Sequence, residues 1–315
     1  MPYQPRTIFN AIRDTDTSGQ PPVSTGFEVA SLWTAAESGN HLVVEVYSIE
    51  PGKESPTVYF PKHTELVVCW RGRGFVTVAP QSNASAPDAP QWDPPYQDVE
   101  IKDGDAVTIP KGALRRFRAA DKIASTDPRD ADKRVGKLVL IVIHALNGNP
   151  LPQQPPAGNF EGTPTKPFPA ALKRNFQDEK YLKFDRVSKN RAVRSRVWGR
   201  DGEGDDGAAD VAKASFQFTL YTFVPRQENP GHFHPHSVEL IICVQGRANT
   251  SVRDKKQNGT GWGNVSQYEL HEGDSLLVKE ASWHRYITSG NDDCLLLALQ
   301  TPHPIMHTLE HETSY

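Results

Sequence analysis

The sequence contains little that would place the protein outside the cell or in a membrane. It has three cysteines among 315 residues, and an odd number argues against a disulfide framework. No apolar run reaches the ~18 residues that a membrane helix needs, and the first residues lack the apolar core of a signal peptide. Charges nearly balance, at a net −3, so nothing indicates nucleic acid or an anionic membrane as a partner. We expect a cytoplasmic protein.

Proline and glycine, in contrast, are abundant, with 26 and 23 residues respectively. This composition favours many short strands joined by turns, and the length favours about two domains. Residues 41–49 and 216–224 alternate apolar and polar side chains, as half-buried strands do. The sequence therefore predicts an all-β protein with two domains.

Three histidines and one carboxylate lie within residues 231–284. His232 and His234 are two apart, so on a strand both rings point to the same face. Pro235 then breaks the strand, which allows Glu239 to begin the next strand and face the two histidines. After a turn at Gly273, His284 stands at the start of a further strand. We therefore predict a metal site with His232, His234, Glu239 and His284 as its ligands.

This spacing resembles the two-part signature of the cupin superfamily. The first part, HxH, four residues, Glu, six residues, Gly, is met by His232, His234, Glu239 and Gly246. The second part is met at Gly273 and His284. Other residues replace its usual proline, glycine and asparagine, namely Lys279, Ala281 and Thr288. These departures affect a turn and not the ligands. The resemblance implies cupin (jelly-roll, double-stranded β-helix) barrels. Known cupins with this ligand set include quercetin-dioxygenase-like enzymes, which this chain resembles, as well as oxalate-degrading enzymes and isomerases.

An earlier segment repeats this region at an offset of 174 residues. The matched positions are Pro51, Glu54, Pro56, Glu65, Leu66, Cys69, Gly72 and Arg73. A tandem duplication explains the match and predicts two barrels. Residues 1–148 would form the N-terminal barrel with an N-terminal arm, 149–175 a proline-rich linker, and 176–315 the C-terminal barrel. We also expect a short helix over residues 170–181.

The first copy lacks three of the four ligands. Val58 and Phe60 replace the two histidines of the HxH motif, and Arg115 replaces His284, whereas Glu65 is retained. An unpaired buried carboxylate costs several kcal/mol. We therefore predict an ion pair between Glu65 and Arg115 in place of the metal. In the alternative interpretation, Arg115 or Arg116 binds a substrate carboxylate.

A divalent ion held by three neutral imidazoles and one carboxylate keeps a charge of about +1 and roughly two open positions. Such a site attracts an anionic small-molecule substrate. Fe(II) is the favoured ion, with Mn, Ni, Co, Cu or Zn as alternatives. With a redox-active ion, substrate and O2 can bind together, so we predict a dioxygenase acting on an aromatic or enolic substrate. Two alternatives remain open: a non-redox lyase, decarboxylase or isomerase, and a non-catalytic binding or storage protein.

Catalytic roles are assigned to two residues. Glu239 could detach and act as a base, and His236 could shuttle protons above the metal, since histidine titrates near neutrality. Cys243 and its counterpart Cys69 are expected to be small core residues. The helically spaced tail histidines, His303, His307 and His311, are interpreted as an exposed tail. The two barrels are compatible with a monomer or a homodimer.

Overall fold

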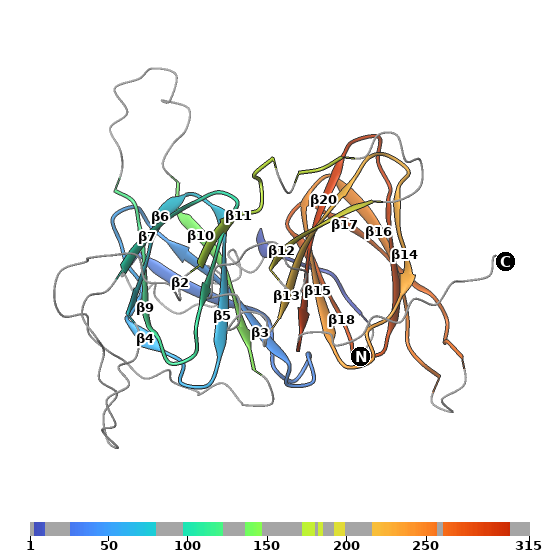
Figure 1. Cartoon of the computed structure of the whole chain (residues 1–315), viewed down its shortest axis with the longest axis horizontal. Coiled ribbons are helices and arrows are strands. Elements are labelled where there is room, and N and C mark those ends of the chain that lie inside the picture. Colours follow the sequence, from blue (N-terminus) through green and yellow to red (C-terminus); the bar gives the residue numbers. More distant parts are fainter. Residues whose placement is uncertain are drawn as a thin grey trace, which may run out of the picture.

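The computed structural model describes residues 3–9, 26–79, 97–121, 136–146, 172–179, 182–184, 192–198, 216–256 and 261–302. These residues form two β-barrels side by side (Figure 1). This confirms the predicted all-β class and the tandem barrels. No helix in the described ranges has the length and apolarity needed to cross a membrane. The predicted linker at 149–175 and the tail histidines fall largely or wholly outside these ranges.

The N-terminal barrel consists of a six-stranded and a four-stranded sheet. The larger sheet has the order β11 (Leu172–Asn175), β8 (Asp105–Ile109), β5 (Thr64–Arg71), β10 (Leu138–Ala145), β3 (Leu42–Ile49) and β2 (Phe27–Trp33). The smaller sheet has the order β4 (Val58–Tyr59), β9 (Leu114–Ala119), β6 (Arg73–Ala79) and β7 (Gln97–Lys102). All of the pairings within them are antiparallel.

The C-terminal barrel repeats this plan. Its larger sheet has the order β1 (Arg6–Thr7), β18 (Asp274–Val278), β15 (Val238–Gln245), β20 (Cys294–Thr301), β13 (Gln217–Phe223) and β12 (Val193–Trp198). The smaller sheet has the order β14 (Glu228–His232), β19 (Trp283–Thr288), β16 (Arg247–Arg253) and β17 (Ser266–His271). The matching strand orders support the duplication that the sequence repeat indicates.

The segment that precedes each barrel contributes an edge strand to the other barrel. The arm strand β1 pairs with β18 of the C-terminal barrel, although residues 1–148 are predicted to form the N-terminal domain. Strand β11, which lies within the predicted linker, pairs with β8 of the N-terminal barrel. The prediction of a helix over residues 170–181 is therefore wrong at Leu172–Asn175, which form a strand. Pairing along a sheet edge overrides the local helical preference there. These two strands cover edges that would otherwise be exposed.

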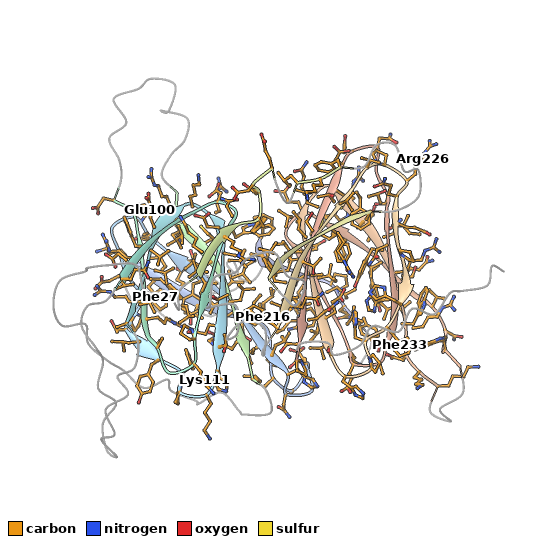
Figure 2. The ribbon with its side chains drawn as sticks, viewed as in Figure 1. Phe27, Glu100, Lys111, Phe216, Arg226 and Phe233 are labelled. Atoms are coloured by element: carbon orange, nitrogen blue, oxygen red, sulfur yellow. The ribbon has the colours of Figure 1, made fainter. Side chains whose placement is uncertain are left out.

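Alternating side chains along the strands divide the core into three clusters. Tyr221, Ile241 and Tyr286 face the interior of the C-terminal barrel. Neighbours of opposite parity, such as Phe218 and Leu220, join Val44 and Ile141 in a cluster that spans both barrels. Figure 2 shows Phe216 at this junction. The strand parity thus separates residues that face the metal-site interior from those that hold the two barrels together.

Candidate metal centre

The four predicted ligands converge in the C-terminal barrel. Strand β14 ends at His232, a turn at Pro235 follows His234, Glu239 lies near the start of β15, and His284 lies on β19. Each offers one ligand atom, and these atoms all lie within 4.8 Å of one another. The four residues are between 0% and 5% exposed. The turn at Pro235 thus brings Glu239 onto the face of the two histidines, as the sequence predicts.

Hydrogen bonds to backbone carbonyl oxygens orient two of the imidazole rings. His232 Nδ1 lies 2.9 Å from the carbonyl oxygen of Pro230, and His284 Nδ1 lies 3.0 Å from that of Ser282. When each Nδ1–H donates to its carbonyl, the Nε2 lone pair is left for a metal. His284 Nε2 is buried, makes no hydrogen bond to any of the described residues and lies 3.5 Å from Glu239 Oε1. An orphaned buried nitrogen within this donor set fits a divalent cation well.

The electrostatics of the cluster also favour ligand function. Burial, followed by the charge of His284, lowers the pKa of His232 to about 3, so this ring is a neutral donor at physiological pH. Burial opposes ionisation of Glu239. The charge of His284 and the hydrogen bond with His234 nevertheless hold the pKa of Glu239 well below its usual range. The cluster therefore presents a neutral His232 imidazole and an ionised Glu239 carboxylate.

Two further residues, which the sequence pattern does not identify as part of the centre, contact Glu239. The Tyr286 hydroxyl donates to Glu239 Oε1 at 2.6 Å, and burial followed by the Glu239 charge raises the pKa of this phenol well above its usual value. Gln300 hydrogen-bonds Glu239 Oε2 and places its Nε2 2.8 Å from His234 Nε2. Tyr286 and Gln300 are brought to Glu239 by the pairing of strands and not by proximity in the sequence. Gln300, for example, lies opposite Glu239 in the sheet.

The two residues given catalytic roles have different surroundings. The side chain of His236 is 83% exposed, and its Nδ1 lies 3.6 Å from Glu280 Oε1. His236 is not part of the ligand cluster, and its proton-shuttle role stays a prediction. Both oxygens of Glu239 accept hydrogen bonds, which stabilise the ionised form and reduce its basicity. Its role as a base likewise stays a prediction. Cys243 is a buried core residue, as expected.

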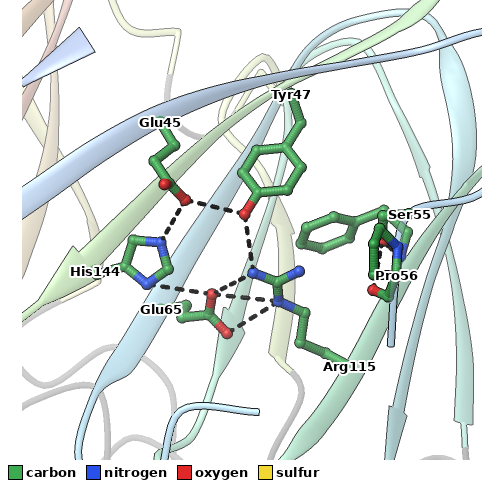
Figure 3. Close-up of polar contacts among 8 residues, drawn as sticks. Glu45, Tyr47, Ser55, Pro56, Glu65, Arg115 and His144 are labelled. Carbon is green, nitrogen blue, oxygen red and sulfur yellow. Dashed lines mark hydrogen bonds and ion pairs between the residues drawn. The ribbon is translucent and has the colours of Figure 1, made fainter. Parts of the chain in front are cut away.

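The N-terminal barrel has an ion pair where the C-terminal barrel has its ligand cluster (Figure 3). Arg115 Nη2 lies 3.0 Å from Glu65 Oε1, and Arg115 Nε lies 3.3 Å from both Glu65 oxygens. The two residues are 1% and 2% exposed. The predicted ion pair is therefore confirmed. Because this buried guanidinium is already paired with Glu65, the structure favours the ion pair over the interpretation in which Arg115 binds a substrate carboxylate.

A ring of contacts extends this ion pair. Arg115 Nη2 also donates to the Tyr47 hydroxyl at 3.2 Å, and Tyr47 donates to Glu45 Oε2 at 2.9 Å. His144 closes the ring, with Nε2 3.1 Å from Glu45 Oε2 and Nδ1 3.4 Å from Glu65 Oε1 (Figure 3). Burial raises the pKa of Tyr47, which keeps the phenol neutral. Two carboxylates, one guanidinium, a phenol and an imidazole thus fill the space used for ligands in the other barrel.

Comparisons with known proteins agree with this architecture. Residues 219–299 match the family model described as the cupin domain. None of the curated protein sequences matches the chain. Among solved structures, the chain is similar to the oxalate decarboxylase of Lactobacillus farciminis in a formate complex. The identity is 14%, the coverage is 99% of this chain and 89% of that one, and the TM-score is 0.63.

The chain is also similar to Bacillus subtilis oxalate decarboxylase, in a structure whose title refers to its Mn(II) centres. The identity is 14%, the coverage is 91% of this chain and 76% of that one, and the TM-score is 0.58. At these identities the likeness concerns the fold. The proteins named are decarboxylases, so the predicted dioxygenase reaction and the preference for iron gain no support from them. Residues 219–299 therefore form a cupin domain, and the chain as a whole has the fold of a two-barrel cupin protein.

Proposed function

We propose that the C-terminal barrel is the centre of a metal-dependent enzyme, a non-redox lyase of decarboxylase type that acts on a small organic acid. The observation that carries this proposal is the buried convergence of His232, His234, Glu239 and His284. The fold shared with oxalate decarboxylases supports this reaction class above the dioxygenase. The Mn(II) centres of the Bacillus subtilis enzyme support manganese as the ion.

A divalent ion at this site would supply Lewis-acid polarisation of a carboxylate or carbonyl oxygen. The residues of the chain would hold it and set its charge, because three neutral imidazoles and one carboxylate leave about +1 on a divalent ion. That charge attracts an anion. Burial of all four side chains excludes water and strengthens this attraction. The Tyr286 hydroxyl fixes the Glu239 carboxylate by donating to its Oε1.

The interior beside the cluster favours a second candidate, a dioxygenase with a larger and less polar substrate. Tyr286 lies next to His284, with ring centroids 5.4 Å apart, and Tyr221 lies 6.4 Å beyond it. Apolar side chains such as Ile241 complete this wall. Such a lining suits an enolic or aromatic substrate better than oxalate, because apolar surface does not stabilise a second negative charge.

One experiment separates these reactions. The protein is purified with Mn(II) present, analysed for metal, and assayed aerobically and anaerobically with oxalate, 2-oxoacids, diketones and catechols. We expect about one equivalent of metal per chain, as a single four-ligand site implies, and release of CO2 without net O2 consumption. The His234→Ala variant should lose both metal and activity. His236 is an exposed histidine two residues away, and the His236→Ala variant of the protein should retain the metal.

Two results would overturn the proposal. Consumption of O2 in proportion to product would replace the lyase with the dioxygenase. Failure of the unaltered protein to retain metal would remove the metal centre and, with it, both enzymatic candidates.

A further inference from the structure

Gln300 occupies a special position beside the ligand cluster. It lies on β20 directly opposite Glu239 on β15 and opposite Gln217 on β13. Directly opposed residues on neighbouring strands project from the same face, so Gln300 points into the barrel beside Glu239. Its side chain is 1% exposed. The carboxamide therefore belongs to the walls of the candidate metal centre.

The contacts of this carboxamide are uneven. One end, Nε2, lies 2.8 Å from His234 Nε2 and hydrogen-bonds Glu239 Oε2. The other end, Oε1, is buried and makes no hydrogen bond within the part of the chain that the structure describes. One end thus contacts two predicted ligand residues, whereas no hydrogen bond from the described residues holds the oxygen in its present place. The two ends are alike in shape and exchange by rotation about the last side-chain bond.

A bound cation would reverse the preference between these two ends. The imidazole nitrogen His234 Nε2 has one lone pair, which a metal and the Gln300 N–H cannot share. The positive end of the N–H dipole would then face a dication at close range, which is repulsive. The carboxamide oxygen at the same place would be attracted, and carboxamide and carbonyl oxygens are ligands for hard divalent cations such as Mn(II).

We propose that Gln300 is a fifth protein ligand of the metal, bound through Oε1 after rotation of its carboxamide. An octahedral ion would then keep one open position rather than two, so that a substrate anion would bind it through a single oxygen. This inference deepens the proposed function and rests on its metal centre, although not on the reaction that the centre performs.

The number of water molecules on the metal tests this inference directly. Mn(II)-loaded protein is prepared in 17O-enriched water, and bound waters are counted by electron paramagnetic resonance and electron-nuclear double resonance. We expect one water in the unaltered protein and two in Gln300→Leu, because the apolar side chain vacates a position. Mn(II) affinity should fall by roughly 10- to 100-fold, but loss of a hydrogen-bonding neighbour alone would do the same, so the water count decides.

Gln217→Leu is the matched control. Gln217 is also a buried glutamine on the adjacent strand, directly opposite Gln300, and its amide nitrogen donates to Thr219 Oγ1 at 3.3 Å. This variant should keep the water count of the unaltered protein. An equal water count in the unaltered protein and in Gln300→Leu would overturn the fifth-ligand inference while leaving the proposed function intact. Failure of the unaltered protein to bind Mn(II) would overturn both.

Discussion

Removing Arg115 should leave Glu65 as a buried carboxylate without its counter-ion. In Arg115→Met an unbranched apolar chain replaces the guanidinium, and its three hydrogen bonds to Glu65 disappear. Breaking one side of a buried ion pair costs about 3–5 kcal/mol. The guanidinium also lies 4.4 Å from the Phe117 ring centre, a cation–π contact worth roughly 0.5–2 kcal/mol. We therefore expect Arg115→Met to destabilise the N-terminal barrel by about 3–5 kcal/mol.

The double variant Glu65→Leu with Arg115→Met removes both charges together. Replacing a buried pair by apolar side chains is often neutral or stabilising, so the double variant should recover most of the loss. Urea unfolding followed by tryptophan fluorescence and circular dichroism measures these differences, with equal slopes required for comparison. Arg116→Met is the control, because its ion pair with Glu54 at 3.2 Å is partly exposed and worth roughly 0–1 kcal/mol.

Two outcomes would refute this reasoning. Arg115→Met could cost no more than Arg116→Met, in which case the buried carboxylate would not depend on its partner. Alternatively, the double variant could cost the sum of Glu65→Leu alone and Arg115→Met alone, which would mean that the charges act independently. The metal content of the C-terminal barrel should stay unchanged in all of these variants.

Three further predictions concern other parts of the two barrels. Burial opposes ionisation of Glu45, but its contacts with His144, Tyr47 and Arg115 together outweigh burial and lower the pKa of Glu45. The stability that this carboxylate contributes is therefore fully present above its unfolded-state pKa of about 4.3 and is lost as the pH falls below that value. Glu45→Gln should flatten this acid limb in thermal unfolding, and an unchanged limb would contradict us. Tyr286→Phe should weaken Mn(II) binding about 10- to 100-fold in a titration, and equal affinity would exclude a role for the hydroxyl. Gly231→Ala would place Cβ 2.1 Å from the Trp283 ring and cost about 1–3 kcal/mol, whereas Gly290→Ala, which meets nothing closer than 3.7 Å, should leave the melting temperature unchanged.

The sequence by itself determined the ligand set, because His232, His234 and Glu239 follow one another at short, fixed spacing and His284 fits the second part of the signature. Parity places His232 and His234 on one face, and Pro235 supplies the turn that brings Glu239 to them. The repeat likewise identified Glu65 and Arg115 as partners 50 residues apart, since each aligns with a ligand of the other barrel. The physical cost of an unpaired buried carboxylate then made the ion pair the favoured interpretation.

Only the tertiary structure decided which residues surround these groups. Gln300 lies 61 residues from Glu239 in the chain, and His144 lies 99 residues from Glu45, so no local pattern connects either pair. Their contacts depend on the register of β20 and β10 against their neighbours, because a shift of one residue would turn every side chain to the opposite face. The exchange of β1 and β11 between the barrels is decided in the same way, since an edge strand pairs with whichever sheet edge lies beside it.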